Sequence, residues 1–283
     1  MRAARWKIAD QTIEFSHGAL IMGVLNVTPD SFSDGGEFFD RDKAITHGLE
    51  MAADGAKIID IGGESTRPGS DSVPAEEELR RVIPVLERIR AGSDVALSID
   101  TAKATVARAA LDAGATIIND ISGGRSDGAM MPLAAERKAA FIIMHMQGTP
   151  RTMQKAPHYD DVVAEVGKFF RQQYTCALDC GIDPMTIAFD PGIGFGKTLE
   201  HNLELLRNLP RLRIDDRPLV VGVSRKSFLG KVIGSSDISD RIAPTIAMTA
   251  LLRDRGADVL RVHDVKPNAA ALRTTEALLG KAE

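Results

Sequence analysis

Acidic and amide side chains close several short apolar runs of this sequence. Asp100 ends VALSID, Asn119 and Asp120 end TIIND, Asp190 ends TIAFD, and Asp60 lies in KIIDI. A carboxylate accepts two parallel N–H hydrogen bonds, and an asparagine side chain offers both a donor and an acceptor. Asp100, Asn119 and Asp190 together would therefore suit a flat heterocycle that carries an amidine-like donor edge.

Basic side chains stand at comparable positions and would suit an anion. Arg261 and His263 end the run VLRVH, Lys226 follows LVVGVS, and Arg67 lies in the loop GGESTRPGS. The chain has 35 Lys and Arg against 39 Asp and Glu, a formal net charge of -4, so any anion site has to be built locally. A structural ion pair is the alternative for each of these cations taken singly.

Other residues that could bind a metal lack the companions that a metal site needs. His145 in MHMQG is a single histidine, and core packing or a structural hydrogen bond is the favoured prediction for it. Cys176 and Cys180 lie four apart in a stretch of helical period, without further ligands at zinc-type spacing. We expect them to be two reduced thiols packed against the core.

Eight apolar runs of strand length supply the framework that must position these residues. Segments around Gly55, Gly114 and Gly256 share one pattern, in which a helix ends at glycine and a buried β run begins soon after. Nearly continuous apolar character is typical of parallel strands covered on both faces. The runs cover residues 19–26, 57–61, 95–100, 116–120, 140–145, 186–190, 219–224 and 259–263.

Amphipathic stretches alternate with these runs, as in βα repeats. They cover residues 41–53, 75–90, 103–113, 159–179, 199–209 and 239–254, and Pro84 predicts a kink or break in the second. The alternation predicts an α/β fold, a (β/α)8 TIM barrel, in a chain slightly above the ~250 residues typical of it. A doubly wound open sheet is the alternative. The segment KIADQTIEF predicts a short N-terminal β-hairpin covering the bottom of the barrel, and without an internal linker we expect residues 1–283 to form a single domain.

In a TIM barrel the C-terminal ends of the strands surround one pocket. We therefore expect the polar residues that end the runs to converge there, namely Asn26, Asp60, Asp100, Asn119, Asp120, His145, Asp190, Arg261 and His263. The near-neutral balance of charge gives no field to attract nucleic acid or an anionic membrane. No apolar span approaches ~20 residues and the first residues lack a signal-peptide core, so a cytoplasmic protein that acts on small molecules is expected.

Eight motifs resemble, in order, those of the dihydropteroate synthases, a family of pterin-binding TIM barrels. They are LNVTPDSFSDGG at 25–36, GGESTRPGS at 62–70, SIDT at 98–101, NDISGG at 119–124, MHMQGTP at 144–150, DPGIGFGK at 190–197, SRKSFLG at 224–230 and RVHDV at 261–265. They span nearly the whole chain and are together highly specific. The resemblance implies a folate-pathway transferase that condenses 6-hydroxymethyl-7,8-dihydropterin diphosphate with 4-aminobenzoate, by loss of diphosphate followed by attack of the amine.

The resemblance also implies residue roles. Catalytic roles would belong to Asp100, Lys226 and Arg67. The pterin would bind to Asp100, Asn119, Asp190 and Lys226, in a slot lined by Ile121, Met144 and Phe195. Asn26 would be a ligand of Mg2+ on the diphosphate, which would also contact Arg261 and His263. The aminobenzoate pocket would comprise Phe32, Thr66, Arg67, Pro68 and Ser227. A homodimer and competition by sulfonamides are further implications.

Three other functions are alternatives to this reading. A corrinoid-type methyltransferase barrel shares acidic pterin contacts but gives no reason for the STRPG loop or for SRKS beside an anion cluster. An aldolase-like barrel would use Lys226 as a Schiff-base nucleophile. A catalytically silent binding module is the third alternative, and the presence of Asn26, Arg67, Lys226 and His263 together argues against it.

Overall fold

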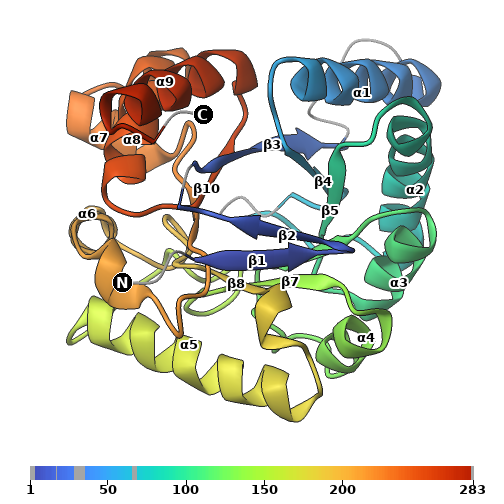
Figure 1. Ribbon diagram of the computed structural model, residues 1–283, viewed down its shortest axis with the longest axis horizontal. Helices are drawn as coiled ribbons and strands as arrows, with labels where there is room; N and C mark the ends of the chain where they lie inside the picture. The colour runs from blue at the N-terminus through green and yellow to red at the C-terminus, as the bar shows by residue number, and fades with distance from the viewer. Residues whose placement is uncertain (1–3, 17, 29–35, 66–68, 282–283) are drawn as a thin grey trace.

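Eight parallel strands form a barrel at the centre of the molecule (Figure 1). The computed structural model describes residues 4–16, 18–28, 36–65 and 69–281, without the side chains of residues 36–40. Hydrogen bonds join the strands in the order β8-β7-β6-β5-β4-β3-β10-β9, and a parallel bridge between Phe189 and Leu219 brings β8 against β9. The prediction of a TIM barrel is therefore confirmed, and the open doubly wound sheet is excluded.

The strands and helices alternate along the chain after the first two strands. The strands are β1 (Arg5–Ile8), β2 (Gln11–Glu14), β3 (Leu20–Asn26), β4 (Ile58–Gly62), β5 (Ala96–Asp100), β6 (Ile117–Asp120), β7 (Ala140–Met144), β8 (Ile187–Asp190), β9 (Val220–Gly222) and β10 (Val259–Val262). The helices are α1 (Gly36–Ala53), α2 (Ala75–Gly92), α3 (Ala104–Asp112), α4 (Met130–Arg137), α5 (Val162–Asp179), α6 (Leu199–Arg207), α7 (Ser227–Ile233), α8 (Ile242–Asp254) and α9 (Val265–Leu278).

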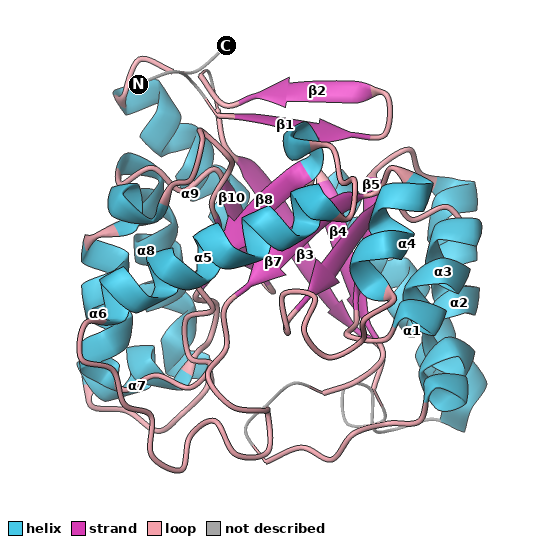
Figure 2. Ribbon diagram, turned by 90° about the horizontal axis from the view of Figure 1, so that it is seen from below, coloured by secondary structure: helices cyan, strands magenta, loops and turns pink. Residues whose placement is uncertain are grey.

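The predicted hairpin is present and covers one end of the barrel. Strands β1 and β2 pair antiparallel and lie across the N-terminal ends of the barrel strands, opposite the long loops (Figure 2). Trp6 is fully buried there, and its Nε1 donates to the carbonyl of Thr186 at 2.8 Å. The hairpin packs on inward-facing residues such as Met22 and Ile117, so its apolar side chains close the bottom of the core.

Side-chain alternation along the strands separates two apolar layers. The inner layer joins the hairpin to residues such as Met22, Ile58 and Ile117. The outer layer contains the residues between them in sequence, such as Ile59 and Ile118, and packs against the surrounding helices. Both faces of each strand are therefore apolar over most of their length, which explains the unbroken apolar runs of the sequence.

Of two local predictions, one is wrong in part and one is wrong. Helix α2 runs from Ala75 to Gly92 with Pro84 inside it, so a break, one of the two predicted outcomes, does not occur. Proline removes the donor that would bond the Arg80 carbonyl, and Nη2 of Arg41 donates to that carbonyl at 3.2 Å instead. Cys176 and Cys180 are free but exposed rather than packed against the core, because their face of α5 is turned outward.

Three helices were not singled out from the sequence. These are α4, α7 and α9, and the first two have only 8 and 7 residues, which leaves little room for a helical period to show.

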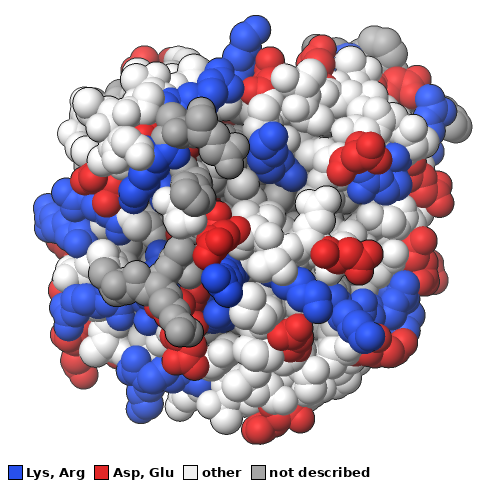
Figure 3. Space-filling model, in the orientation of Figure 1, with Lys and Arg blue, Asp and Glu red and all other residues white. Residues whose placement is uncertain are grey.

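On the face that carries the hairpin, basic and acidic side chains are interspersed (Figure 3). Among the described residues, no helix combines the length and apolar character needed to cross a membrane.

Candidate active site

The inward-facing positions change from apolar to polar towards the C-terminal ends of the strands. On β6 the inner residue Ile117 is followed two positions later by Asn119, and on β10 Val259 is followed by Arg261. A spacing of two keeps each pair on the same face of its strand. The barrel interior is therefore sealed with apolar side chains at the hairpin end and lined with polar ones at the loop end.

Arg261 links two buried carboxylates across this end of the barrel. Its Nε donates to Oδ2 of Asp60 at 2.6 Å, and its Nη2 donates to Oδ2 of Asp100 at 2.7 Å. Nδ2 of Asn119 donates to the same Asp60 oxygen at 2.9 Å. Four side chains from β4, β5, β6 and β10 thus form one network, as the sequence predicted for the strand ends.

Three acceptor oxygens of this network have no partner. Oδ1 of Asp60, Oδ1 of Asp100 and Oδ1 of Asn119 are buried and accept no hydrogen bond in the part of the chain that the structure describes. An unpaired buried acceptor is costly, so such atoms call for donors from a bound molecule. The network therefore offers several acceptors to an N–H-rich ligand.

The charges of the network shift one another's ionisation. Burial raises the pKa of Asp100 to about 7, while the guanidinium of Arg261 opposes the shift and the carboxylate of Asp60 adds to it. Although burial disfavours the charged form of Arg261, the two carboxylates raise its pKa above the ordinary value. Arg261 thus stays charged, and Asp100 can gain or lose a proton near neutral pH.

Asp190 and Lys226 form the opposite side of the site. Burial raises the pKa of Asp190 and lowers that of Lys226 to about 8, and the attraction between their charges opposes both shifts. Oδ1 of Asp190 accepts from the backbone N–H of Gly192 at 2.7 Å. Nζ of Lys226 donates to the Ile193 carbonyl and lies 4.8 Å from the centre of the Phe195 ring.

A small apolar cluster adjoins these polar groups. It contains Ile121, Met144, Met146 and Met153, with Phe195 packed against it. Methionine side chains adapt to the shape of a ligand and pack well against rings. Ile121, Met144 and Phe195, the predicted lining of the slot, are therefore gathered on one apolar surface beside the carboxylates.

His263 is the first residue after β10 and lies two residues beyond Arg261. Its Nδ1 is 3.0 Å from Oγ of Ser224, and its backbone N–H donates to the same oxygen at 3.1 Å. Burial, reinforced by the charge of Arg261, lowers the pKa of His263 to about 3. At neutral pH the imidazole is uncharged, so in this state it offers a hydrogen bond rather than a positive charge.

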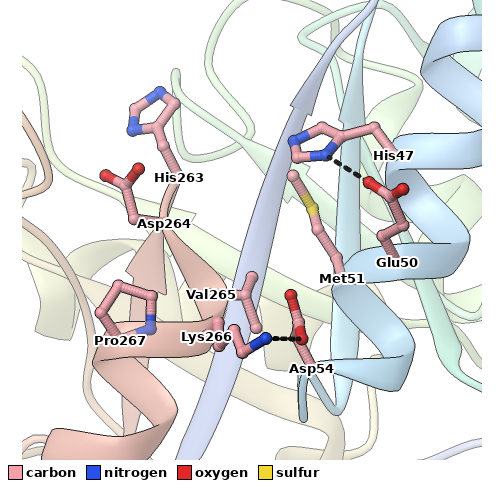
Figure 4. Close-up of a pocket in the computed structure, with 9 residues that line it drawn as sticks. All are labelled: His47, Glu50, Met51, Asp54, His263, Asp264, Val265, Lys266 and Pro267. Atoms are coloured by element: carbon pink, nitrogen blue, oxygen red, sulfur yellow. Dashed lines mark ion pairs between the residues drawn. The ribbon is translucent and has the colours of Figure 1, made fainter.

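A separate cavity of about 190 Å³ lies between α1 and the start of α9 (Figure 4). His263, Asp264 and Lys266 line it from one side, and His47 and Glu50 line it from α1. It contains none of the carboxylates of the network. The cavity therefore borders the site at His263 without belonging to it.

Asp120 and His145 do not join the network, contrary to expectation. Each lies one residue out of phase with the inward row of its strand, so its side chain points to the other face. Both oxygens of Asp120 accept loop N–H groups, at 2.7 Å from Ser122 and 2.9 Å from Gly124. His145 packs edge-on against Phe169 of α5, which confirms the predicted packing role.

The remaining predicted residues fall into two groups. Asn26 ends β3, half-buried and in register with Gly62 and Asp100, and Ser227 is the exposed first residue of α7. Phe32, Thr66, Arg67 and Pro68 lie outside the described residues. The pterin and diphosphate candidates are thus placed together, whereas most of the aminobenzoate candidates are not described.

Two groups of contacts were missed at the sequence level. Lys197, in DPGIGFGK, is buried and bonded to His145 and to backbone carbonyls, which a motif match alone does not reveal. Lys103 pairs with Glu64 and with Glu78, and so ties the loop after β4 to α2. Because side chains alternate between the two faces of a strand, sequence position can separate the acidic residues that face the barrel interior from those that face the helices. No spacing along the sequence predicts the long-range partners of Lys197 and Lys103.

The described residues include no group of three or more His, Cys, Asp or Glu side chains arranged to hold a metal ion. Asn26 is an oxygen donor of the kind that Mg2+ accepts, at the strand end next to the network. Mg2+ is commonly bound by one or two protein oxygens together with substrate phosphates. The donor set thus fits an ion shared with a phosphate-bearing ligand.

The chain matches a family model described as pterin binding enzyme over residues 22–263. The dihydropteroate synthase of Synechocystis sp. is 47% identical over 258 residues, which cover 91% of this chain and 89% of that protein. The dihydropteroate synthase of Escherichia coli is 46% identical over 272 residues, 96% of this chain and 95% of that protein.

Solved structures agree with these relatives. The dihydropteroate synthase of Xanthomonas albilineans with 4-aminobenzoic acid has a TM-score of 0.91 and 44% identity, covering 98% of each chain. The enzyme of Yersinia pestis with a sulfonamide drug has a TM-score of 0.91 and 41% identity, covering 98% of this chain and 99% of that one. The enzyme of Burkholderia cenocepacia with 7,8-dihydropteroate has a TM-score of 0.89 and 41% identity, covering 99% and 98%.

Proposed function

Because the chain belongs to the dihydropteroate synthases of the pterin-binding enzyme family, we propose that it joins a pterin to an aromatic amine at the loop end of its barrel. It is a transferase of folate biosynthesis that condenses 6-hydroxymethyl-7,8-dihydropterin diphosphate with 4-aminobenzoate, giving 7,8-dihydropteroate and diphosphate. The relatives named above are dihydropteroate synthases rather than corrinoid methyltransferases or aldolases, so those alternatives are set aside.

The observation that carries the proposal is the set of unpartnered acceptors on Asp60, Asp100 and Asn119. A dihydropterin presents N–H donors along its amidine edge, and buried acceptors without partners discriminate strongly in favour of a ligand that supplies them. Asp190 and Lys226 would complete recognition with one acidic and one basic side chain. The Ile121, Met144 and Phe195 surface would contact the faces of the ring.

The reaction breaks the bond between the pterin methylene and the diphosphate oxygen, and the electron pair leaves with diphosphate. Positive character on the methylene would be stabilised by nearby carboxylates, Asp100 foremost, once it is ionised. The amine of 4-aminobenzoate, neutral at pH 7, attacks the methylene and then loses its proton. No residue of this chain is needed as a strong base to start the attack.

The departing diphosphate would be received by Arg261 and His263. Arg261 engages its Nε and Nη2 with carboxylates, and its Nη1 makes no hydrogen bond to the described residues, so a donor is left for an anion. His263 would donate a hydrogen bond in its neutral form. Arg67 and Lys226 would add positive charge, Arg67 on the loop after β4.

We propose Mg2+ as the cofactor, with the amide oxygen of Asn26 as its protein ligand. The ion would neutralise charge on the diphosphate as it leaves. Asn26, at the end of β3, would orient the diphosphate relative to the methylene, a positioning effect.

Aminobenzoate would occupy a pocket of Phe32, Thr66, Arg67, Pro68 and Ser227. A sulfonamide drug bound to the Yersinia pestis enzyme supports the proposal that sulfonamides compete with aminobenzoate here, since both are flat anilines with an acidic group opposite the amine. Ser227 would orient the carboxylate of aminobenzoate from the start of α7.

A homodimer is proposed for the assembled enzyme. The outward face of α8 carries Ala243, Ala247 and Leu251 at helical spacing, and Leu251 is 51% exposed. Val232 of α7 and Ile238, which precede α8 in the sequence, are also exposed. Apolar stripes of this kind on a helix are typical of protein interfaces.

The cytoplasm is the proposed compartment, where two exposed free thiols would stay reduced.

Turnover with both substrates tests the function. Diphosphate release should require the pterin diphosphate, aminobenzoate and Mg2+ together, and dihydropteroate should form in equal amount. Asp190→Ala should abolish pterin binding in calorimetry, whereas Asp160→Ala, at a carboxylate that is 99% exposed, should leave it unchanged. Diphosphate release at full rate without the amine, or failure to form dihydropteroate, would refute the proposal.

A further inference from the structure

We propose that Lys197 is a positioning residue for pterin binding, which holds the turn 192–196 in the shape that presents Phe195 and Lys226 to the pterin slot. The inference rests on the proposed function, because it assigns the substrate that the turn serves. Lys197 lies at the end of DPGIGFGK and is 3% exposed.

The amino group of Lys197 is surrounded by acceptors from two strand ends. Its Nζ lies 3.0 Å from Nδ1 of His145, 3.0 Å from the Gly192 carbonyl and 3.0 Å from the Phe195 carbonyl. A further contact to the His145 carbonyl is 3.4 Å long. Three short contacts match the three N–H donors of an ammonium group. Lys197 therefore joins the loop after β8 to the end of β7.

Lys197 lacks a counter-ion among the described residues. Arg253, which is equally buried, pairs with Glu276, whereas Lys197 forms no ion pair with a carboxylate and, like the buried Arg217, donates to backbone carbonyls. Burial lowers the pKa of Lys197 well below its ordinary value, and Asp190 opposes this effect only from a distance. A lysine placed at such a cost, bonded mainly to loop carbonyls, indicates a need to fix that loop.

The turn and the end of β7 approach each other too closely to tolerate ordinary side chains. Gly192 has a positive φ of 63°, and a Cβ at this position would lie 1.9 Å from the His145 carbonyl oxygen. The carbonyls of Gly192 and Phe195 and, at a longer distance, that of His145 contact Nζ of Lys197. Without the amino group the Gly192 carbonyl would keep its bond from the Phe195 N–H, but Nδ1 of His145 and the Phe195 carbonyl would lose the donor that Lys197 supplies, which would allow the turn to shift.

The other side of the same turn faces the pterin slot. Lys226 donates to the Ile193 carbonyl and lies over the Phe195 ring, so two lysines bond one turn through neighbouring carbonyls. A shift of this turn would displace the Phe195 ring and the Lys226 amino group together. Both are proposed pterin contacts, whereas none of the proposed aminobenzoate residues belongs to this turn, and Ser227 alone directly follows one of the two contacts, Lys226, in the sequence. Loss of Lys197 should therefore impair pterin binding selectively.

Two substitutions at Lys197 and one control test the inference in the full-length enzyme. Lys197→Met keeps the apolar length of the side chain without donors, and Lys197→Gln restores N–H donors without charge. Lys168→Met, at an exposed lysine on α5, is the control. Calorimetry measures the Kd of pterin diphosphate, and steady-state assays with saturating pterin diphosphate measure the KM of aminobenzoate.

The Lys197→Met enzyme should bind pterin diphosphate about tenfold or more weakly, since small misplacements of a contact cost this much or more. In the same Lys197→Met enzyme the KM of aminobenzoate should change less than about twofold. Lys197→Gln should recover part of the affinity for pterin diphosphate. The control Lys168→Met should match the wild type. A lower unfolding temperature with unchanged pterin affinity would overturn the inference, as would equal losses for both substrates. Failure of both variants to fold would also overturn it, because a positioning residue leaves the barrel intact. If the wild-type enzyme neither binds the pterin nor turns over, the proposed function fails instead.

Discussion

Replacing Asp60 by asparagine tests the network at the centre of the site. Asp60 is fully buried, and its Oδ2 accepts from Nε of Arg261 at 2.6 Å and from Nδ2 of Asn119 at 2.9 Å. Asparagine has nearly the same shape but no charge. The substitution therefore removes the ionic contact without opening a cavity.

The expected loss of stability follows from these contacts. A hydrogen bond to a charged group contributes about 1.5–3 kcal/mol and a neutral one about 1 kcal/mol. The introduced asparagine would keep one carbonyl oxygen for one of the two donors, and Arg261 would keep Asp100 as a partner, so the full cost of an unpaired buried charge, about 3–5 kcal/mol, is not reached. We expect Asp60→Asn to lower the free energy of unfolding by about 2–3 kcal/mol, which corresponds to a fall of roughly 3–5 °C in Tm for a chain of this length.

Urea unfolding of four proteins provides the assay. The wild type, Asp60→Asn, Arg261→Met and the double variant form a double-mutant cycle, whose coupling energy should exceed about 1 kcal/mol. Asp160→Asn, at an exposed carboxylate, should change the free energy of unfolding by less than about 0.5 kcal/mol. If Asp60→Asn is as stable as the wild type, or if the two substitutions are additive, the two residues do not stabilise each other and the reasoning is wrong.

Four further outcomes follow from the same contacts. Pterin affinity should fall as the pH rises through about 8, where Lys226 loses its charge. Lys226→Arg should abolish this pH dependence. The same pH midpoint in the variant would contradict the proposed role of Lys226 in pterin binding. Because burial raises the pKa of Asp100 to about 7 from 3.8, its contribution to stability is greatest below pH 3.8 and is lost as the pH rises through about 7. Asp100→Asn should therefore flatten this part of the pH profile of urea unfolding, and an unaltered slope would count against it. Trp6→Ala should lower the free energy of unfolding by about 3–5 kcal/mol without altering either KM, and a changed KM would show that the hairpin also serves the site. Cys176 and Cys180 should both react with a thiol reagent in the native enzyme, and protection of either would contradict its exposure.

The barrel could be predicted because its signals are local. A largely apolar run predicts each barrel strand. Gly55 and Gly114 each follow the end of a helix with a positive φ, 112° and 104°, which glycine adopts readily. The short helices α4 and α7 escaped notice because seven or eight residues hold only two turns of a periodic pattern.

The site could be predicted in part because the motif residues are fixed along the chain. Asp100, Asn119, Asp190 and Lys226 follow from strand ends and family resemblance, and the structure brings them to one end of the barrel. The prediction for Asp120 is wrong because side chains alternate along a strand, and this alternation turns Asp120 away from the site.

The sequence by itself determined the repeated βα pattern, the apolar interior of each strand and the residue types available at the strand ends. These features depend on residues only a few positions apart, so short stretches of the sequence contain the information that determines them. Only the tertiary structure decided that Arg261 bonds Asp60 and Asp100, and that Lys197 lies among carbonyls from two loops. The partners of Arg261 lie 201 and 161 residues away in the chain, and closure of the barrel is what brings their charges together. Burial then sets the ionisation of Asp100 and Lys226, because the free energy of a charge depends on everything that surrounds it in space.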